Sequence, residues 1–274
     1  MEIKNRKGAR NRKEVPEEVK ILLNHGKIEA VNLVESLVID QEELLKNVLI
    51  DLKSEKYLDS CKNEINNMKK KTYPQFMSTI GKTLLKQSKE NNDQELFKNF
   101  SNHTSDIVRS WACYFIGFDN DLTLAEKFEA IKPFASDEHF SVREEAWFVM
   151  REDILNNLEE SISILSKWTK EENPYFRRFA SEATRPCGVW TKHINDLKES
   201  PDLALSILDP LKSDKEKYVQ DSVGNWLNDA SKSNPQWVKD LCKNWIETST
   251  TKETEKIVKR GLRTISKNAS SKND

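Results

Sequence analysis

The stretch SVREEA (141–146) decides the fold, because variants of it recur along the second half of the chain. In each variant an apolar residue precedes a fixed position, the anchor, and a small or aliphatic residue lies three positions after it. The other variants are IVRSWA (107–112), YFRRFA (175–180), YVQDSV (218–223) and IVKRGL (257–262). Residues four apart share one face of a helix, so each variant predicts a helix that packs on its neighbours.

The intervals between the anchors are typical of a helical repeat. The anchors lie 34, 34, 43 and 39 residues apart, and they are Arg109, Arg143, Arg177, Gln220 and Lys259. A polar loop precedes each variant, and a further amphipathic stretch lies between variants. One such unit cannot bury its apolar face alone, so neighbouring units must stack. We therefore predict an all-α, HEAT-like helical-repeat solenoid of antiparallel helix pairs with a concave face, clearest over 95–266.

The composition agrees with helices and limits the function. The 274 residues include only 7 Gly and 8 Pro, fewer than a turn-rich β fold needs. Lys and Arg (44) nearly balance Asp and Glu (45), so net charge gives no support for nucleic-acid binding. The four cysteines form no CxxC pair, which favours a reducing, cytoplasmic location. We expect a monomer without a signal peptide or membrane helix.

Further helices are expected upstream of the repeats. The pattern predicts one over 17–26, closed by Gly26, one or two over 30–52, and a pair over 57–70 and 73–90, the last beginning at Pro74. We expect a single repeat domain over 14–266 and a disordered tail over 267–274. Residues 1–13 carry six basic residues and one acid. They are expected to form a flexible arm that is either simply solvated or in contact with phosphates.

Acidic residues recur on one stripe of the repeat helices. Position one after the anchor lies about 200° from the packed residue at position three, at about 100° per residue, and positions five and nine continue the same stripe. Glu144, Glu182 and Asp229 occupy this stripe, and Trp190 follows Glu182 closely. The stripe predicts a carboxylate cluster on the concave face. Basic residues flank it: Arg178, Arg185, Lys192, His193, Lys217, Lys256, Arg260 and Arg263. Such an arrangement suits a polyanion that carries a local positive charge.

Several familiar catalytic patterns are missing from the sequence. GKT at 81–83 lacks the earlier glycine of a phosphate-binding loop, because that position is Phe76. The sequence contains no HExxH, GxGxxG or GxSxG. Nucleotide, metal and serine-nucleophile mechanisms therefore have no support, and we expect no cofactor.

Residues 175–229 resemble the AlkC and AlkD superfamily of bacterial alkylpurine DNA glycosylases, which consist of HEAT-like repeats. The similarity is greatest to the AlkC branch, where SEGTRPRLPW is followed by a repeat like YVRRSVANHLND. The counterparts here are SEATRPCGVW (181–190) and YVQDSVGNWLND (218–229). Weaker similarity extends through SVREEAWF (141–148) to RKGAR (6–10).

The resemblance implies a DNA glycosylase that removes cationic N3-methylated bases from double-stranded DNA. By motif, Asp229 would stabilise the positive charge that develops on the sugar. Glu182 and Glu144 would bind the base or shape the pocket, and Trp190 would hold the base or sugar. Phosphate contacts would come from Arg178, Arg185, Lys217, Arg260 and Arg263, although Arg185 is better placed to tie down the loop after Glu182.

Two departures from the family pattern leave an alternative open. Cys187, Gly188 and Val189 replace an Arg-Leu-Pro, and Gln220 and Asp221 replace two arginines. Both changes weaken the expected contact with phosphates. The alternative is a non-catalytic HEAT-repeat scaffold that binds a protein or nucleic acid and has lost glycosylase activity.

Overall fold

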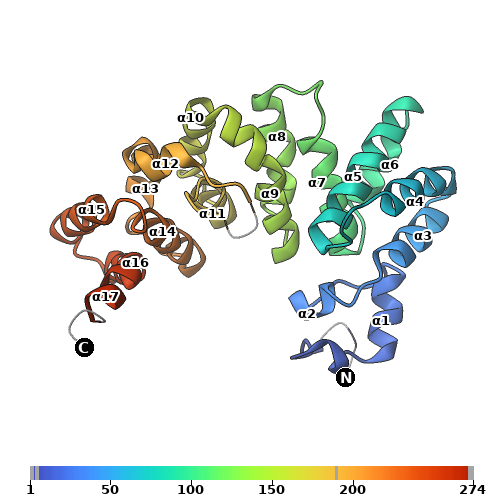
Figure 1. Cartoon of the computed structure of the whole chain (residues 1–274), viewed down its shortest axis with the longest axis horizontal. Helices are drawn as coiled ribbons and strands as arrows, with labels where there is room; N and C mark the ends of the chain where they lie inside the picture. Colours follow the sequence, from blue (N-terminus) through green and yellow to red (C-terminus); the bar gives the residue numbers. More distant parts are fainter. Residues whose placement is uncertain (1–2, 4–5, 189–190, 271–274) are drawn as a thin grey trace. The chain divides into compact units, whose positions relative to one another are not determined.

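The computed structural model describes the chain apart from residues 1–2, 4–5, 189–190 and 271–274, and its described residues form helices and loops without a strand (Figure 1). The chain divides into two units. One comprises residues 1–123 and 137–149, and the other comprises residues 124–136 and 150–274. The helix α9 (Phe140–Asn156) contributes its first half to the first unit and its second half to the second.

The helices agree closely with those expected from the sequence, except that the last one extends to Ser270 and so includes residues 267–270 of the tail that we expected to be disordered. Besides the start of α9, the first unit contains η2 (Arg12–Glu14), α1 (Glu17–Asn24), α2 (Leu33–Ser36), α3 (Gln41–Asp51), η3 (Glu55–Tyr57), α4 (Leu58–Asn66), α5 (Tyr73–Glu90), α6 (Gln94–Ser101) and α7 (Asp106–Gly117). The second contains α8 (Leu124–Ala135), α10 (Leu158–Trp168), α11 (Pro174–Ala183), α12 (Asn195–Glu199), η4 (Pro201–Ala204), α13 (Leu205–Leu211), α14 (Lys217–Ala230), α15 (Pro235–Thr248), α16 (Lys252–Gly261) and α17 (Arg263–Ser270). All five repeat variants lie on helices, as predicted.

Gly26 ends α1 as the sequence predicted. Its φ of +63° is a left-handed conformation that favours glycine. The amide of Gly26 donates to the carbonyl of Leu23 and that of Lys27 to the carbonyl of Leu22, both at 2.9 Å. This pair of bonds satisfies carbonyls that the last turn would otherwise leave unpaired.

The repeat anchors share one structural role, which the sequence did not reveal. Each of the first four donates from a terminal side-chain nitrogen to the two backbone carbonyls six and five positions before it, in the loop that enters its helix. Gln220 does this with its amide at 2.8 and 3.1 Å, where the other three use a guanidinium. Gln220 is buried, and its uncharged amide makes the same loop contact as the guanidinium of the other three anchors. Lys259, the fifth anchor, is exposed.

Two of these arginines also connect successive repeats. Arg109 binds Asp137 with Nε and Nη2 at 2.8 and 3.0 Å, and Arg177 binds Asp214 in the same way at 2.6 and 3.2 Å. Each aspartate lies in the loop before the next repeat helix. Each guanidinium thus binds both the loop that enters its own helix and the loop that enters the next repeat helix.

We predict that Arg177→Ala lowers the free energy of unfolding by about 2–4 kcal/mol, because it leaves the largely buried Asp214 carboxylate and two loop carbonyls without a partner. Urea unfolding followed by circular dichroism measures this loss. Lys259→Ala is the matched control, since it removes a cation from the same repeat position at an exposed site, and it should change stability by less than about 0.5 kcal/mol. Equal effects of the two substitutions would contradict the role of the anchor.

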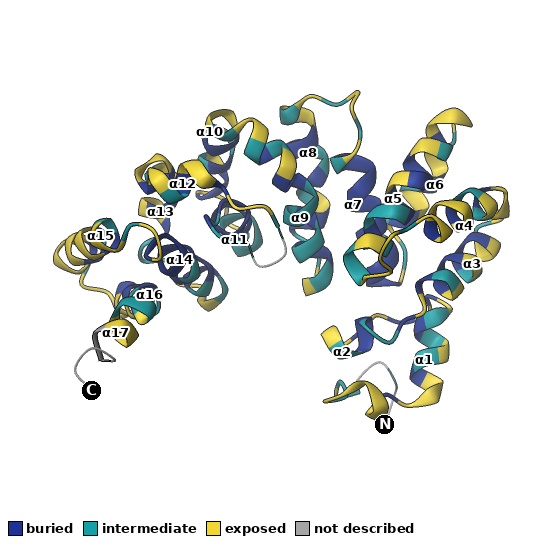
Figure 2. Ribbon diagram, in the orientation of Figure 1, coloured by how far each residue is buried: buried dark blue, intermediate teal, exposed yellow. Residues whose placement is uncertain are grey.

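Helix α14 is covered on two sides, since α11 and α16 both pack on it. Figure 2 shows most of α14 in the buried colour, as it shows α7. Val223 and Trp226 are fully buried on α14, but so is the carboxylate of Asp229. Asp229, which the sequence placed on a stripe away from the core, is therefore buried.

Candidate functional site

Glu182 and Asp229 lie on α11 and α14, the two packed helices of the second unit. Glu182 is in the last turn of α11, which begins at Pro174 after the N-cap Asn173 and ends before Thr184. Asp229 is in the last turn of α14. The two residues are 6% and 2% exposed, so each carboxylate must be paired to be tolerated.

Arg185 bridges the two carboxylates. Its Nη1 donates to Oε1 of Glu182 at 2.7 Å, while Nε and Nη2 donate to Oδ2 of Asp229 at 2.8 and 2.7 Å. From the sequence we expected Arg185 to tie down the loop after Glu182. In the structure its guanidinium lies between the two predicted acids. We call Glu182, Arg185 and Asp229 the acid cluster.

The remaining oxygens of the acid cluster also have partners. Ser222 donates to Oε2 of Glu182 at 2.7 Å, and the Nζ of Lys232 lies 2.7 Å from Oδ1 of Asp229. The Lys232 side chain is 49% exposed, whereas that of Asp229 is 3% exposed. Three of the four carboxylate oxygens thus accept hydrogen bonds from Arg185 or Ser222. The fourth, Oδ1 of Asp229, pairs with a lysine that is open to solvent.

Cations keep Glu182 ionised. Burial alone would raise the pKa of its carboxyl, but the charges of Arg178 and Arg185 outweigh burial and lower that pKa. Arg178 lies 3.7 Å from Oε2 of Glu182, and its guanidinium lies over the ring of Tyr218 at 4.4 Å. Burial would lower the pKa of Arg185, but the carboxylates of Glu182 and Asp229 outweigh it and raise that pKa.

Three predicted DNA-binding residues gather elsewhere, around the first and middle turns of α14. Arg260 donates to Asp221 at 2.5 Å, and Lys217 also pairs with Asp221. Arg263 donates to Asn225 at 2.9 Å. Lys217 and Arg263 are exposed, so these cations are accessible to solvent. We call Lys217, Arg260 and Arg263 the cation group.

The other two predicted site residues are Glu144 and Trp190. Glu144 belongs to the first unit, where Trp147 donates from Nε1 to its carboxylate at 2.8 Å. Trp190 lies outside the described residues. The part of the chain that the structure describes brings together Glu182, Asp229, Arg178 and Arg185 among the predicted residues.

Arg151 on α9 is a residue that sequence reasoning missed. It is 3% exposed, and it donates to the carbonyls of Ala183, Arg185 and Lys192. Burial, with the nearby charge of Arg185, lowers the pKa of this guanidinium to about 10. Its position follows no repeat spacing and its acceptors are backbone atoms, so no pattern in the sequence points to it.

The pKa of Glu145, the residue after Glu144, is also shifted. Tyr114 donates from its hydroxyl to the Glu145 carboxylate. Burial raises the pKa of Glu145 from 4.5 to about 7, with a further contribution from the charge of Glu144 and an opposing one from the Tyr114 hydrogen bond. The folded protein therefore binds a proton at this carboxyl that the unfolded chain releases between pH 4.5 and 7.

We predict that the protein loses about 1–3 kcal/mol of stability at Glu145 as pH rises from 5 to 8, since the folded state binds more protons in that window and ionising the carboxyl then costs free energy. Glu145→Gln removes the titration while keeping a partner for Tyr114. Its unfolding free energy should exceed that of wild type at pH 8 and approach it at pH 5, as measured by urea unfolding. A variant that is less stable than wild type by a constant amount at both pH values would contradict this account.

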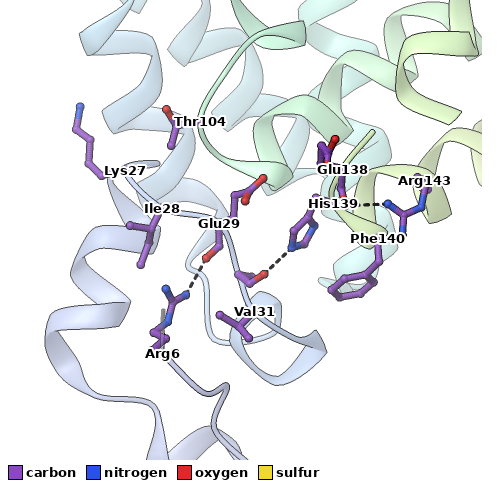
Figure 3. A pocket seen from close by; sticks show the side chains of 11 residues that line it. Arg6, Lys27, Ile28, Glu29, Val31, Thr104, Glu138, His139, Phe140 and Arg143 are labelled. Carbon is purple, nitrogen blue, oxygen red and sulfur yellow. Dashed lines mark hydrogen bonds between the residues drawn. The ribbon is translucent and has the colours of Figure 1, made fainter. Parts of the chain in front are cut away.

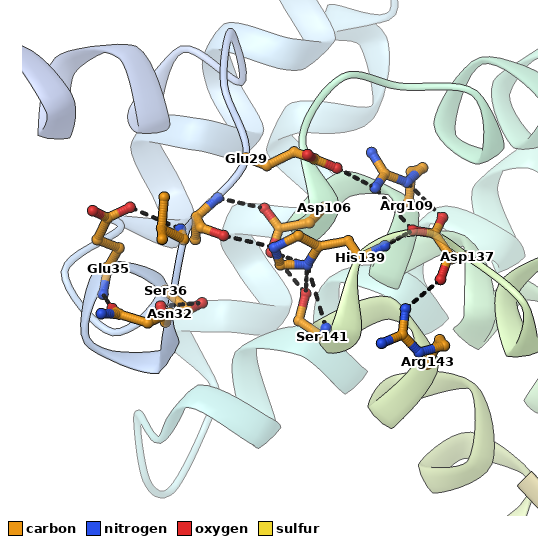
Figure 4. Close-up of polar contacts among 12 residues, drawn as sticks. Glu29, Asn32, Glu35, Ser36, Asp106, Arg109, Asp137, His139, Ser141 and Arg143 are labelled. Atoms are coloured by element: carbon orange, nitrogen blue, oxygen red, sulfur yellow. Dashed lines mark hydrogen bonds and ion pairs between the residues drawn. The ribbon is translucent and has the colours of Figure 1, made fainter. Parts of the chain in front are cut away.

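A second polar network fixes the N-terminal part of the first unit (Figure 4). The fully buried Asp106 accepts from the amide of Ala30 at 3.1 Å and from the hydroxyl of Ser141 at 2.7 Å. The Nε2 of His139 lies 2.6 Å from the carbonyl of Ala30, so this nitrogen carries the proton. Both polar groups of Ala30 are thereby held.

Arg6 ties part of the basic N-terminal segment to this region. It lies 2.5 Å from the buried carboxylate of Glu35 and donates to the carbonyl of Glu29 at 2.7 Å. Composition alone predicted a flexible arm, and it did not reveal this contact. Figure 3 shows Arg6 at the edge of a cavity of about 570 Å³, whose opposite side is formed by His139, Phe140 and Arg143.

Within the described ranges, no group of three or more His, Cys, Asp or Glu side chains could hold a metal ion. No helix among those residues is long and apolar enough to cross a membrane.

Comparisons with known proteins agree with the resemblance. The model of a family described as DNA alkylation repair enzyme matches residues 145–265. The uncharacterized protein YhaZ of Bacillus subtilis (strain 168) is 35% identical over 169 residues, which make up 59% of this chain and 46% of that protein. The matched family segment contains the whole acid cluster and Arg151, and it begins one residue after Glu144.

Solved structures share the helical-repeat fold. The Pseudomonas fluorescens alkylpurine DNA glycosylase AlkC, bound to DNA containing an abasic site analog, aligns with a TM-score of 0.66 at 22% identity, covering 94% of this chain and 65% of that chain. AlkD2 from Streptococcus mutans aligns with a TM-score of 0.55 at 24% identity, covering 76% and 96%. The chain spans about half the length of the curated relative and less than two thirds of the AlkC chain. These alignments confirm the predicted HEAT-like fold, and the family match over residues 145–265 supports the resemblance to the AlkC and AlkD superfamily.

Proposed function

We propose that the chain is a DNA glycosylase that excises cationic N3-methylated bases from double-stranded DNA, with the acid cluster at its reaction centre. The observation that carries this proposal is the meeting of Glu182 and Asp229, buried on adjacent helices and bridged by one guanidinium. The segment that matches the DNA alkylation repair family contains all three residues, and the AlkC relative was solved with DNA.

The reaction needs a negatively charged carboxylate and does not need a proton donor. An N3-methylated base already carries a positive charge, so no proton is needed for it to leave. As the bond between C1′ and the base nitrogen breaks, positive charge moves onto the sugar. A carboxylate fixed in advance stabilises that charge and orients the attacking water. We assign this role to Asp229, with Glu182 and Glu144 binding the base and Trp190 holding it by a cation–π contact worth about 1–2 kcal/mol.

The two oxygens of Asp229 differ in a way that suits this role. Oδ2 is fixed by two hydrogen bonds from Arg185, whereas Oδ1 faces the ammonium of Lys232. An ion pair with a half-exposed lysine contributes little, at most about 1 kcal/mol, so a substrate cation can displace it. In this proposal Lys232 occupies the place that the charged sugar takes in the transition state.

Phosphate contacts fall to the cation group. Arg178 and Arg185 are held by Glu182 and Asp229 in the free protein, which leaves Lys217, Arg260 and Arg263 as the solvent-accessible cations of the predicted set. Contacts of this kind fix the position of the DNA without reading its sequence.

Base release from methylated duplex DNA tests the proposal. The wild-type chain is incubated with an oligonucleotide that carries one N3-methylated adenine, and the free base is separated by chromatography. Release of the base, with an abasic strand that alkali then cleaves, is the expected result. An intact strand after prolonged incubation with excess protein would overturn the proposal.

One observation favours a second candidate, a non-catalytic scaffold that binds a protein or nucleic acid. Each carboxylate oxygen of the acid cluster already accepts a hydrogen bond or ion pair. On this view the cluster only joins α11 to α14. Retention on DNA–cellulose identifies a protein-binding scaffold: retention lost steeply with salt supports contact with DNA, and no retention at low salt supports a protein-binding scaffold. Among proteins that are retained, base release separates the glycosylase from a nucleic-acid-binding scaffold.

A further inference from the structure

We propose that Arg151 is a positioning residue that holds the loop between α11 and α12 against the acid cluster, and so fixes the orientation of Arg185. This inference rests on the proposed function of the cluster. It assigns a role in base release to a residue that contacts neither of the two acids in its hydrogen bonds.

The contacts of Arg151 are specific to this loop. Nη1 donates to the carbonyl of Ala183 at 2.6 Å, and Nη2 donates to that of Arg185 at 2.6 Å. Nη2 and Nε also donate to the carbonyl of Lys192, at 3.1 and 3.2 Å. One guanidinium therefore binds the chain at the start and near the end of the loop.

The bonded positions are those that set the acid cluster. Ala183 directly follows Glu182, and Arg185 is the residue whose side chain bridges Glu182 and Asp229. Because Arg151 fixes the backbone at both points, it restricts where the Arg185 guanidinium can lie. A displacement of about 1 Å at a reaction centre can lower a rate about 100-fold.

Two contacts lie within the described residues of the loop itself. The amide of Ile194 donates to the carbonyl of Pro186 at 3.0 Å, which closes the loop on itself. A Cβ at Gly188 would lie 1.7 Å from Oγ1 of Thr191, so a larger residue there would require the Thr191 hydroxyl to move. Arg151 joins this loop to α9 through the carbonyls of Ala183, Arg185 and Lys192.

Lysine cannot replace the arginine in this arrangement. A guanidinium presents five donors in a rigid plane and reaches three carbonyls at once, whereas an ammonium is a compact point charge on a flexible stem. Arg151→Lys therefore keeps the positive charge near Glu182 and Asp229 but removes the fork. If the charge alone matters, lysine preserves function, and if positioning matters, it does not.

The test compares Arg151→Lys with Arg177→Lys in the full chain. Arg177 also holds loop carbonyls with a guanidinium, but in the loop that enters α11, so its variant controls for the loss of a fork elsewhere. Hydrogen exchange is measured for peptides that cover 184–194. Single-turnover base release is measured at saturating methylated DNA, together with the dissociation constant for DNA.

We expect Arg151→Lys to speed exchange in 184–194 and to slow single-turnover release about 10- to 100-fold, with the DNA dissociation constant within about twofold of wild type. Arg177→Lys should leave exchange in 184–194 unchanged. Unchanged exchange in Arg151→Lys would show that Arg151 does not hold the loop. Faster exchange with base release at the wild-type rate would show that holding the loop does not position Arg185 for the reaction. If wild type releases no base, the proposed function fails, and exchange in 184–194 still decides whether Arg151 holds the loop.

Discussion

Asp229→Asn is expected to lower single-turnover base release by at least about 100-fold while the protein stays folded. Asparagine matches aspartate in shape, so its oxygen can still accept from Arg185. It lacks the negative charge that the proposed transition state requires. Removing one fixed electrostatic stabiliser of a developing charge typically costs about 100- to 1,000-fold in rate. The rate of free-base release at saturating enzyme measures the loss.

Asp214→Asn is the matched control for this variant. Asp214 is also a largely buried carboxylate held by two guanidinium nitrogens, but its partner is Arg177 in a repeat loop. The control should lose stability and keep the wild-type rate below its unfolding temperature. An Asp229→Asn protein that is folded by circular dichroism and releases base as fast as wild type would contradict the assigned role.

Asp221→Asn is expected to strengthen DNA binding about tenfold at low salt. Asp221 pairs with Lys217 and Arg260, so in the free protein it competes with phosphates for two members of the cation group. Neutralising it frees both cations and steepens the dependence of log affinity on log salt by about one to two, since each added phosphate contact contributes about 0.9. Fluorescence anisotropy with labelled duplex over a range of salt concentrations measures both effects.

Asp240→Asn makes the same change in net charge at an exposed position on α15, where Asp240 accepts from Gln236. A general effect of net charge would raise affinity equally in both variants. The account instead requires a steeper salt dependence in Asp221→Asn alone. Affinity and slope that stay at wild-type values would show that the cation group does not contact DNA.

The helical repeats could be predicted because their cause is local. The spacing of apolar residues around each anchor places one face of a helix against its neighbour, and the structure contains helices at all five variants. Gly26 was predictable for the same reason, because a left-handed residue after a helix favours glycine. The role of the anchors was not, since their acceptors are backbone carbonyls, which every residue carries.

The candidate site was predictable only in part. Helical spacing put Glu182 and Asp229 on equivalent faces, and the structure brings them to one guanidinium. Their burial was not foreseen, because spacing along one helix does not report how closely α11 and α14 pack. Arg151 had no signal in the sequence, for its partners are carbonyls of a distant loop.

A double-mutant cycle on Glu182 and Asp229 tests the central claim most directly. Single-turnover release of N3-methyladenine from one duplex is measured for wild type, Glu182→Gln, Asp229→Asn and the double variant. Residues that act as one unit are strongly non-additive, so the account predicts that the double variant is about as slow as Asp229→Asn alone. Release at the wild-type rate in all three variants would contradict it.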